Sequence, residues 1–164
     1  MHQKLLKLIL LSVLLSGPSL AKNTDRTQPM DISADNSDFE LTDSGSSTIK
    51  GNVVISQGTL LINADNAVIV RVKGEISKIT LSGNPARMQQ MNDNGELMKA
   101  SAKSIVYLIS TEQIFLLGNV IIDQTRGSMR GESIRYDTKT GRLHAGGDGT
   151  RIQMRLEPKI QDKK

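Results

Sequence analysis

Histidine, serine and paired carboxylates are the residues of this chain that could carry out catalysis. The chain has no cysteine and two histidines, and only His144 lies beyond the first 21 residues. One imidazole without a cysteine co-ligand does not make a zinc site. A serine triad would have to use that same imidazole, and no serine occupies a Gly-x-Ser-x-Gly elbow. We therefore expect no catalytic residue and no metal site, with His144 a solvent-facing strand residue.

Two pairs of acids could perform acid–base work on a sugar, namely Asp35 with Asp38 and Asp137 with Asp148. Acids beside Asn and Gly are more often turn formers than catalysts. The glycine-rich residues 146–149 do not open a helix, so they are expected to form a bend and not a phosphate cradle. The sequence therefore predicts a protein that is not an enzyme and has no cofactor.

The N-terminal residues have the three regions of a secretory signal peptide. Lys4 and Lys7 precede an apolar run at 8–15, and Ser19-Leu20-Ala21 then forms a small-x-small cleavage pattern. This run of about eight residues is too short to cross a hydrocarbon core, which needs about 20. We expect three segments: a cleaved signal peptide at 1–21, one domain at 22–156 and a polar flexible tail at 157–164.

The charge of the chain excludes one class of partner. Removing residues 1–21 takes away two lysines and no acid, so the formal net charge falls from +4 to +2, since 4 − 2 = 2. A domain this close to neutral is not expected to bind nucleic acid through its charge.

Apolar residues in the rest of the chain alternate with period two and do not follow helical spacing, which predicts an all-β, antiparallel fold. Asp93-Asn94-Gly95, Lys73-Gly74 and Thr140-Gly141 supply the backbone freedom that tight hairpins need. Short strands are expected at 53–56, 59–63, 67–72, 77–81, 86–90, 104–109, 113–117, 120–124, 128–130, 133–137, 142–144 and 150–156.

An internal repeat organises these strands. The segment from Gly51-Asn52 recurs from Gly118-Asn119 without a break in register, and a weaker copy begins at Gly83. The rough period is about 30 to 35 residues, which we interpret as two hairpins of short strands. Units of this size cannot bury a face alone, so they are expected to stack into one elongated, two-sided sheet structure.

Alternation predicts which side chains of the repeats face inward. One face is consistently apolar, and the other carries residues such as Ser56, Asn63, Asp123 and Arg130. The interior is expected to be filled by aliphatic side chains, since the chain has two Tyr, two Phe and no Trp. The predicted inward residues of the two strong repeats are Val53, Ile55, Leu60, Ile62, Val120, Ile122, Met129, Ile134 and Tyr136.

Four features of the sequence occur together: the string from Gly51 to Asp65, the segment from Gly83 to Gly95, the stretch from Ala100 to Tyr107 and the second Gly118-Asn119. Together they resemble the LptA/OstA-like family of lipopolysaccharide transport proteins. Their order and spacing carry the resemblance, which extends from Gln28 to about Leu156. It implies a folded-over antiparallel β-jellyroll, or β-taco, with an apolar groove, in a periplasmic protein that shields the acyl chains of lipid A.

The resemblance also implies which residues line that groove. Family positions carry over to Met30, Ile32, Met88, Tyr107 and Ile109, and Met88 stands where the family pattern has an aromatic residue. The predicted inward face adds Val53, Ile55, Leu60, Ile62, Leu116, Val120, Ile122, Met129 and Ile134. An ordinary closed core remains the alternative for each of these residues, because buried apolar strand faces usually only pack.

The partners that the resemblance implies are lipopolysaccharide, an LptC-like protein at the inner membrane and the N-terminal domain of an LptD-like protein at the outer membrane. Strands near Met30–Ala34 and near Arg151–Leu156 are expected to leave unpaired edges at opposite ends, where copies of the chain can join head to tail. Polar tails at 22–27 and 157–164 could cap these edges instead.

Two other functions remain open at this point. The chain could be a structural or adhesive β-repeat protein with a filled core and no lipid ligand. It could also be a carbohydrate-active enzyme on a β-solenoid, which would need a cluster of acids on one outward face.

Overall fold

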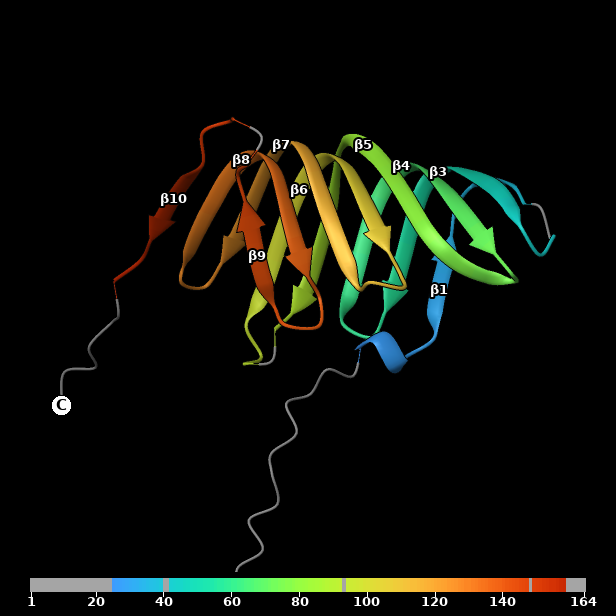
Figure 1. Ribbon diagram of the computed structural model, residues 1–164, viewed down its shortest axis with the longest axis horizontal. Coiled ribbons are helices and arrows are strands. Elements are labelled where there is room, and N and C mark those ends of the chain that lie inside the picture. The colour runs from blue at the N-terminus through green and yellow to red at the C-terminus, as the bar shows by residue number, and fades with distance from the viewer. Residues whose placement is uncertain (1–24, 40–41, 93, 148, 159–164) are drawn as a thin grey trace, which may run out of the picture.

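A computed structural model describes residues 25–39, 42–92, 94–147 and 149–158. Within these residues the chain forms one ten-stranded antiparallel sheet, in the order β1-β3-β4-β5-β6-β7-β8-β10, with β2 beside β3 and β9 beside β8 (Figure 1). The all-β, antiparallel prediction is confirmed. The elements are η1 (Asp25–Thr27), β1 (Met30–Ser33), β2 (Asn36–Asp38), β3 (Gly45–Gln57), β4 (Leu60–Val72), β5 (Glu75–Met91), β6 (Leu97–Leu108), β7 (Gln113–Gln124), β8 (Gly127–Asp137), β9 (Arg142–Ala145) and β10 (Gln153–Leu156).

A crease crosses the middle of the six long strands, β3 to β8. In β3 it lies at Gly51-Asn52 (φ +78° and +46°), and in β7 at Gly118-Asn119 (φ +80° and +50°). The pairing register of every neighbouring pair of long strands shifts at this level. Irregularities that lie side by side bend the sheet along one line, as bulges do.

The crease divides the sheet into two halves. The A half contains 53–57, 60–63, 86–91, 97–101, 120–124 and 127–130, with β1 and β10 at its edges. The B half contains 45–50, 66–72, 75–82, 104–108, 113–117 and 133–137, with β2 and β9 at its edges. Figure 1 shows the bends on one side of the molecule and most of the hairpin turns on the other.

Acidic side chains hold the crease in place. Asn52 Nδ2 donates to the Asp35 carboxylate over 2.8 Å, and the backbone N–H of Asn84 donates to Asp65 over 3.1 Å. The N–H of Asn119 donates in the same way to Glu132 over 3.3 Å. The Gly-Asn corners of β3, β5 and β7 therefore each meet an acid, which comes from the segment between β1 and β2, from β4 and from β8 respectively, and these corners are what recurs in the sequence repeat.

The prediction of twelve short strands was wrong in one consistent respect. Segments 59–63 and 67–72 belong to the single strand β4, and the same merging occurs in β5, β7 and β8. A Gly-Asn or Ala-Asp corner looks like a strand end in the sequence, but the chain continues into the other half of the sheet after it. The repeat unit is therefore one pair of long bent strands, not two hairpins of short ones.

The hairpin turns form two lips opposite the crease. Lip A contains the turns after β3, β5 and β7, and lip B contains the turns after β4, β6 and β8. The predicted turns at Lys73-Gly74, Gly95 and Gly141 are confirmed, with φ of +53° and +82° in the first and of +75° and +68° at the other two glycines.

The inner faces of both halves form one aliphatic core. It contains Val53, Ile55 and Ile62 of the A half and Ile69, Ile79 and Ile105 of the B half, all 0% exposed. Each such side chain contributes about 1.5–3 kcal/mol of burial free energy. No helix in the described part of the chain is both long and apolar enough to span a membrane.

The ends of the chain are described in part. The expected signal peptide, 1–21, and residues 159–164 of the expected tail lie outside the described residues. Asp25–Thr27, which belong to the polar tail expected at 22–27, form η1 and contact both lips. Near the other end, the N–H of Glu157 donates to the Arg126 carbonyl over 3.0 Å.

Candidate functional site

The inner face of the A half carries a row of cross-strand partners that runs the length of the molecule. All but one member are long aliphatic or thioether side chains, and the exception is Ala100. In order from β1 to β10 the row is Ile32, Ile55, Ile62, Met88, Ala100, Ile122, Met129 and Met154. Methionine adapts to irregular apolar neighbours because its chain is unbranched and polarizable.

The B half presents matching rows toward this wall. One row is Ile49, Ala67, Leu81, Ile105, Leu116, Ile134 and Ala145. The next row toward lip B begins at Ile69 and continues through Ile79, Tyr107, Ile114, Tyr136 and Leu143. The two halves meet at the crease and therefore enclose a continuous apolar interior.

All fourteen residues that the sequence placed in a groove lie in this interior or against it. Ten are buried: Val53, Ile55, Leu60, Ile62, Met88, Tyr107, Leu116, Val120, Ile122 and Ile134. Four are half-buried and pack against the core: Met30, Ile32, Ile109 and Met129. The sequence prediction omitted most of the B half, including Ile49, Ile69, Ile79, Leu81, Ile105 and Ile114, although the same alternation runs through those segments.

The interior is open to the outside at the β10 end. A hollow of about 140 Å³ there is lined mainly by apolar side chains, among them Ile122, Met129 and Leu143. Met154 is 59% exposed and Leu156 is 74% exposed, although Met154 continues the inner row of the A half. The expected strand edges at opposite ends are confirmed, because β1 and β10 close the two ends of the strand order.

Polar contacts connect the two lips near the β1 end. On lip A, Asp25 accepts hydrogen bonds from the N–H and hydroxyl of Thr59, over 2.8 and 2.5 Å, and from Gln90 Nε2 over 2.8 Å. On lip B, the turn after β6 supplies Glu112, which forms an ion pair with Arg26. We call residues 25–27 the strap, because they join lip A to lip B across the mouth of the folded sheet.

A second contact between the halves lies just inside the strap. The Tyr107 hydroxyl of the B half donates to Gln57 Oε1 of the A half over 3.4 Å. The amide of Gln57 donates to the carbonyls of Arg26 and Gln28, over 3.3 and 3.1 Å. Burial, together with the nearby carboxylates of Glu112 and Asp25, raises the pKa of Tyr107, so its hydroxyl keeps its proton at neutral pH.

Burial alone would raise the pKa of Asp25, but the hydrogen bonds from Thr59 and Gln90 outweigh it and lower this pKa below its ordinary value. The carboxylate is therefore the form that holds the strap on lip A. No sequence pattern indicated this contact, because Asp25 lies 34 residues from Thr59 and 65 from Gln90.

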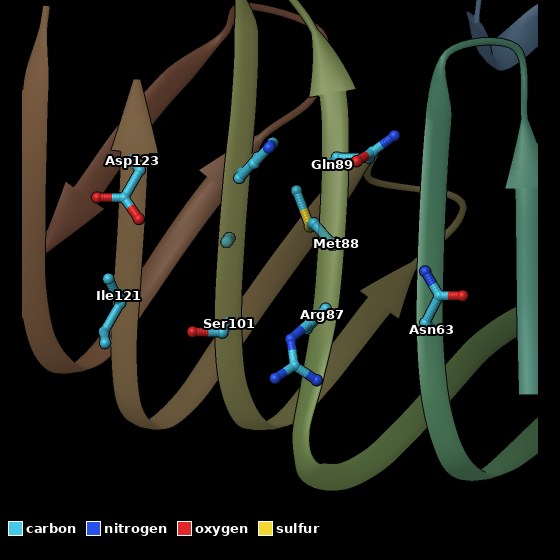
Figure 2. Close-up of a pocket in the computed structure, with 9 residues that line it drawn as sticks. Asn63, Arg87, Met88, Gln89, Ser101, Ile121 and Asp123 are labelled. Carbon is cyan, nitrogen blue, oxygen red and sulfur yellow. The ribbon is translucent and has the colours of Figure 1, made fainter. Parts of the chain in front are cut away.

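The outer surface of the A half has a polar hollow of about 400 Å³ (Figure 2). It lies over β4 to β7, and Asn63, Arg87, Ser101 and Asp123 project into it. Met88 and Ala100 contribute to its floor although their side chains belong to the inner row. This hollow and the apolar interior lie on opposite faces of the same strands.

Two of the four acids considered for catalysis, Asp35 and Asp137, accept hydrogen bonds within the fold, and Asp148 lies outside the described residues. Asp137 accepts the N–H groups of Thr140 and Lys139, over 2.8 and 3.0 Å, and chiefly the Thr140 bond lowers its pKa. Asp35 accepts from Asn52 at the crease. His144 is exposed on β9, as expected. Among the described residues, no three acidic or histidine side chains are grouped as a metal site requires.

Comparison with known proteins gives consistent results. Residues 31–142 match the family model described as LptA/(LptD N-terminal domain) LPS transport protein. The lipopolysaccharide export system protein LptA of Escherichia coli (strain K12) is 34% identical over 96% of this chain and 88% of the relative. The protein of the same name from Haemophilus influenzae is 32% identical over 84% of this chain and 81% of the relative.

A solved structure has the same fold. It is the crystal structure of LptH, the LptA-homologous periplasmic component of the lipopolysaccharide transport device from Pseudomonas aeruginosa. The TM-score is 0.73 at 25% sequence identity, and the match covers 82% of this chain and 99% of that chain.

Proposed function

Since the chain belongs to the family of LptA and LptD N-terminal domain lipopolysaccharide transport proteins, we propose that it binds lipopolysaccharide and shields the acyl chains of lipid A in transit between membranes. This proposal rests mainly on the unbroken inner row from Ile32 to Met154. The row forms an apolar wall that runs from β1 to the exposed edge strand β10.

The physical need for such a wall follows from the hydrophobic effect. Each methylene exposed to water costs about 0.8 kcal/mol, so a bundle of acyl chains cannot cross an aqueous compartment unshielded. In the structure, the side chains of both halves fill the interior. Acyl chains would enter between the lips, and the angle between the two halves at the crease would widen to admit them. The strap and the contact of Tyr107 with Gln57 join the halves toward the mouth, so these contacts would open during entry.

The fourteen residues that the sequence placed in the groove are the proposed lipid contacts. They lie on both walls, with Ile62 and Met88 on the A half and Tyr107 and Leu116 on the B half. The phosphates and sugars of the ligand would remain in water outside the lips. Binding of this kind needs no chemical step, so the protein acts as a carrier and not as an enzyme.

Location and partners are part of the same proposal. The signal-peptide pattern at 1–21 and the description of LptH as periplasmic support a periplasmic location. The unpaired edges of β1 and β10 lie at opposite ends, and Met154 and Leu156 expose apolar surface at one of them. Strand addition at such edges would join copies head to tail and would join the chain to LptC-like and LptD-like partners.

The proposal is tested by displacement of a hydrophobic fluorescent probe from the folded protein. Lipopolysaccharide should release the probe in proportion to its concentration, and the polysaccharide freed of lipid A should not. Probe that does not bind, or that lipopolysaccharide leaves in place, would instead favour the structural β-repeat protein with a filled core.

A further inference from the structure

Gln90 is a polar residue in an apolar wall. It is 6% exposed and continues the inner alternation of β5 after Ala86 and Met88. Its strand partner in β6 is Met98, which is also buried. A buried carboxamide in such surroundings is stabilised only when its donors and its acceptor all have partners.

Among the residues that the structure describes, only one end of the Gln90 carboxamide finds a partner. Nε2 donates to the Asp25 carboxylate over 2.8 Å, while Oε1 is buried and accepts no hydrogen bond from the residues that the structure describes. Exchanging the two amide atoms would place Oε1 against a carboxylate oxygen, where two acceptors repel each other. Asp25 therefore fixes which atom points away from it.

Gln57 is a second glutamine near lip A, and both the nitrogen and the oxygen of its side-chain amide form hydrogen bonds. It also ends a strand at lip A, and its Nε2 donates to the carbonyls of Arg26 and Gln28 while its Oε1 accepts from Tyr107. The free acceptor on Gln90 is thus a property of that position and not of glutamines at this lip.

We propose that Gln90 Oε1 is a binding site for a hydrogen-bond donor on the ligand, namely a hydroxyl or amide N–H close to the root of an acyl chain. The site rests on the proposed function, because it needs an acyl chain inside the folded sheet. Gln90 lies at the end of β5, beside lip A, so a chain that enters between the lips brings its first few carbons, not its methyl end, to this depth. Asp25 acts as a positioning residue that orients the amide.

The site would make the groove selective. An unsubstituted chain leaves Oε1 buried without a donor, whereas a chain with a hydroxyl near its carbonyl group satisfies it. The difference between the two ligands is one hydrogen bond to a buried neutral acceptor, which corresponds to about three- to tenfold in affinity.

The experiment compares two probes, tetradecanoic acid and 3-hydroxytetradecanoic acid, by displacement of the fluorescent probe from the full-length protein. The wild type should bind the hydroxylated acid about three- to tenfold more tightly. In Gln90→Met, which keeps an unbranched side chain but has no acceptor, this preference should disappear while tetradecanoic acid still binds. Gln89→Met, on the opposite face of β5, should keep the preference.

Each outcome is decisive. Equal binding of the two acids to the wild type, or a preference that survives in Gln90→Met, would overturn the site and leave the apolar groove intact. Binding of neither acid, together with failure of lipopolysaccharide to displace the probe, would contradict the proposed function itself. If Gln90→Met does not fold, Gln90→Leu and the ratio of the two affinities in the wild type provide the same test.

Discussion

Arg26 and Glu112 form an ion pair that joins the two lips of the folded sheet. Both side chains are partly exposed, at 34% and 26%, so the pair contributes at most about 1 kcal/mol to stability. Its position is more important than its strength. It joins the lips at the strap, and it would have to break for the two halves to move apart.

Removal of this ion pair should ease the entry of an apolar ligand. In Arg26→Ala we expect the association rate of the hydrophobic probe to rise several-fold, with a loss of stability of about 1 kcal/mol or less. Stopped-flow fluorescence measures the rate. Arg155→Ala is the matched control, because it breaks an ion pair with Glu157 beyond β10. Equal rates in the wild type and both variants would show that the strap does not restrict the mouth.

The Asp25 carboxylate should titrate below its ordinary pKa of 3.8, because Thr59 and Gln90 donate to it in the folded state. Because the pKa of Asp25 is lower in the folded state, its ionised carboxylate stabilises the protein above about pH 3.8. This contribution is lost as the pH falls from there through the pKa of Asp25 in the folded state. The difference in unfolding free energy between the wild type and Asp25→Asn should therefore shrink on acidification below pH 3.8. Carbon-detected NMR gives the pKa directly, and a midpoint above 3.8 would contradict these contacts.

The crease should be sensitive to a side chain at Gly51. A Cβ there would lie 2.6 Å from the Asp35 carboxylate, which accepts from Asn52. At Gly141, whose φ of +68° is also positive, a Cβ would meet no atom within 4 Å. Gly141→Ala should cost about 1–2 kcal/mol for the left-handed backbone alone. Gly51→Ala should cost about 1 kcal/mol more, since it displaces Asp35 from Asn52.

Urea denaturation of the two glycine variants measures this difference. The m-values should stay equal to that of the wild type, because the same surface is exposed on unfolding. Equal losses of stability in Gly51→Ala and Gly141→Ala would mean that the contact of Asp35 with Asn52 does not support the crease.

Self-association should depend on the apolar face of β10. In Met154→Lys and Leu156→Lys, a charge replaces an exposed apolar side chain on the edge of the A half, and we expect the dissociation constant of the head-to-tail complex to rise about tenfold or more. Sedimentation velocity over a range of concentrations measures it. Gln153→Lys changes the neighbouring residue on the opposite face and should have little effect. Association that is unaltered in all three variants would place the contact elsewhere.

The sequence predicted the local features of this fold well. Alternation placed Val53 and Ile55 inside and Asn63 and Asp123 outside, because a strand has a period of two wherever it lies. Gly74 and Gly141 marked hairpins because their positive φ angles suit glycine. These signals depend on neighbouring residues alone.

Features that depend on distant residues could not be predicted in this way. The local sequence Gly-Asn can form a bend within a strand or a turn at the end of a strand. The sequence alone does not distinguish the two, so it predicts short strands where the structure has long bent ones. Asp25 looked like part of a polar tail because its partners, Thr59 and Gln90, become neighbours only when β3, β4 and β5 are assembled. A glutamine at an inward position after Ala86 and Met88 was the one local sign of the site at Gln90.

Site-specific photocrosslinking to lipopolysaccharide tests the central claim most directly. The photoreactive residue is placed at Ile62, which is 0% exposed in the inner row, and at its neighbour Asn63, which is exposed on the outer face. Tyr107 provides a second inner position on the opposite wall. We predict crosslinks at Ile62 and Tyr107 and none at Asn63. Crosslinking at Asn63 alone, or at none of the three positions, would contradict a lipid path between the two halves of the sheet.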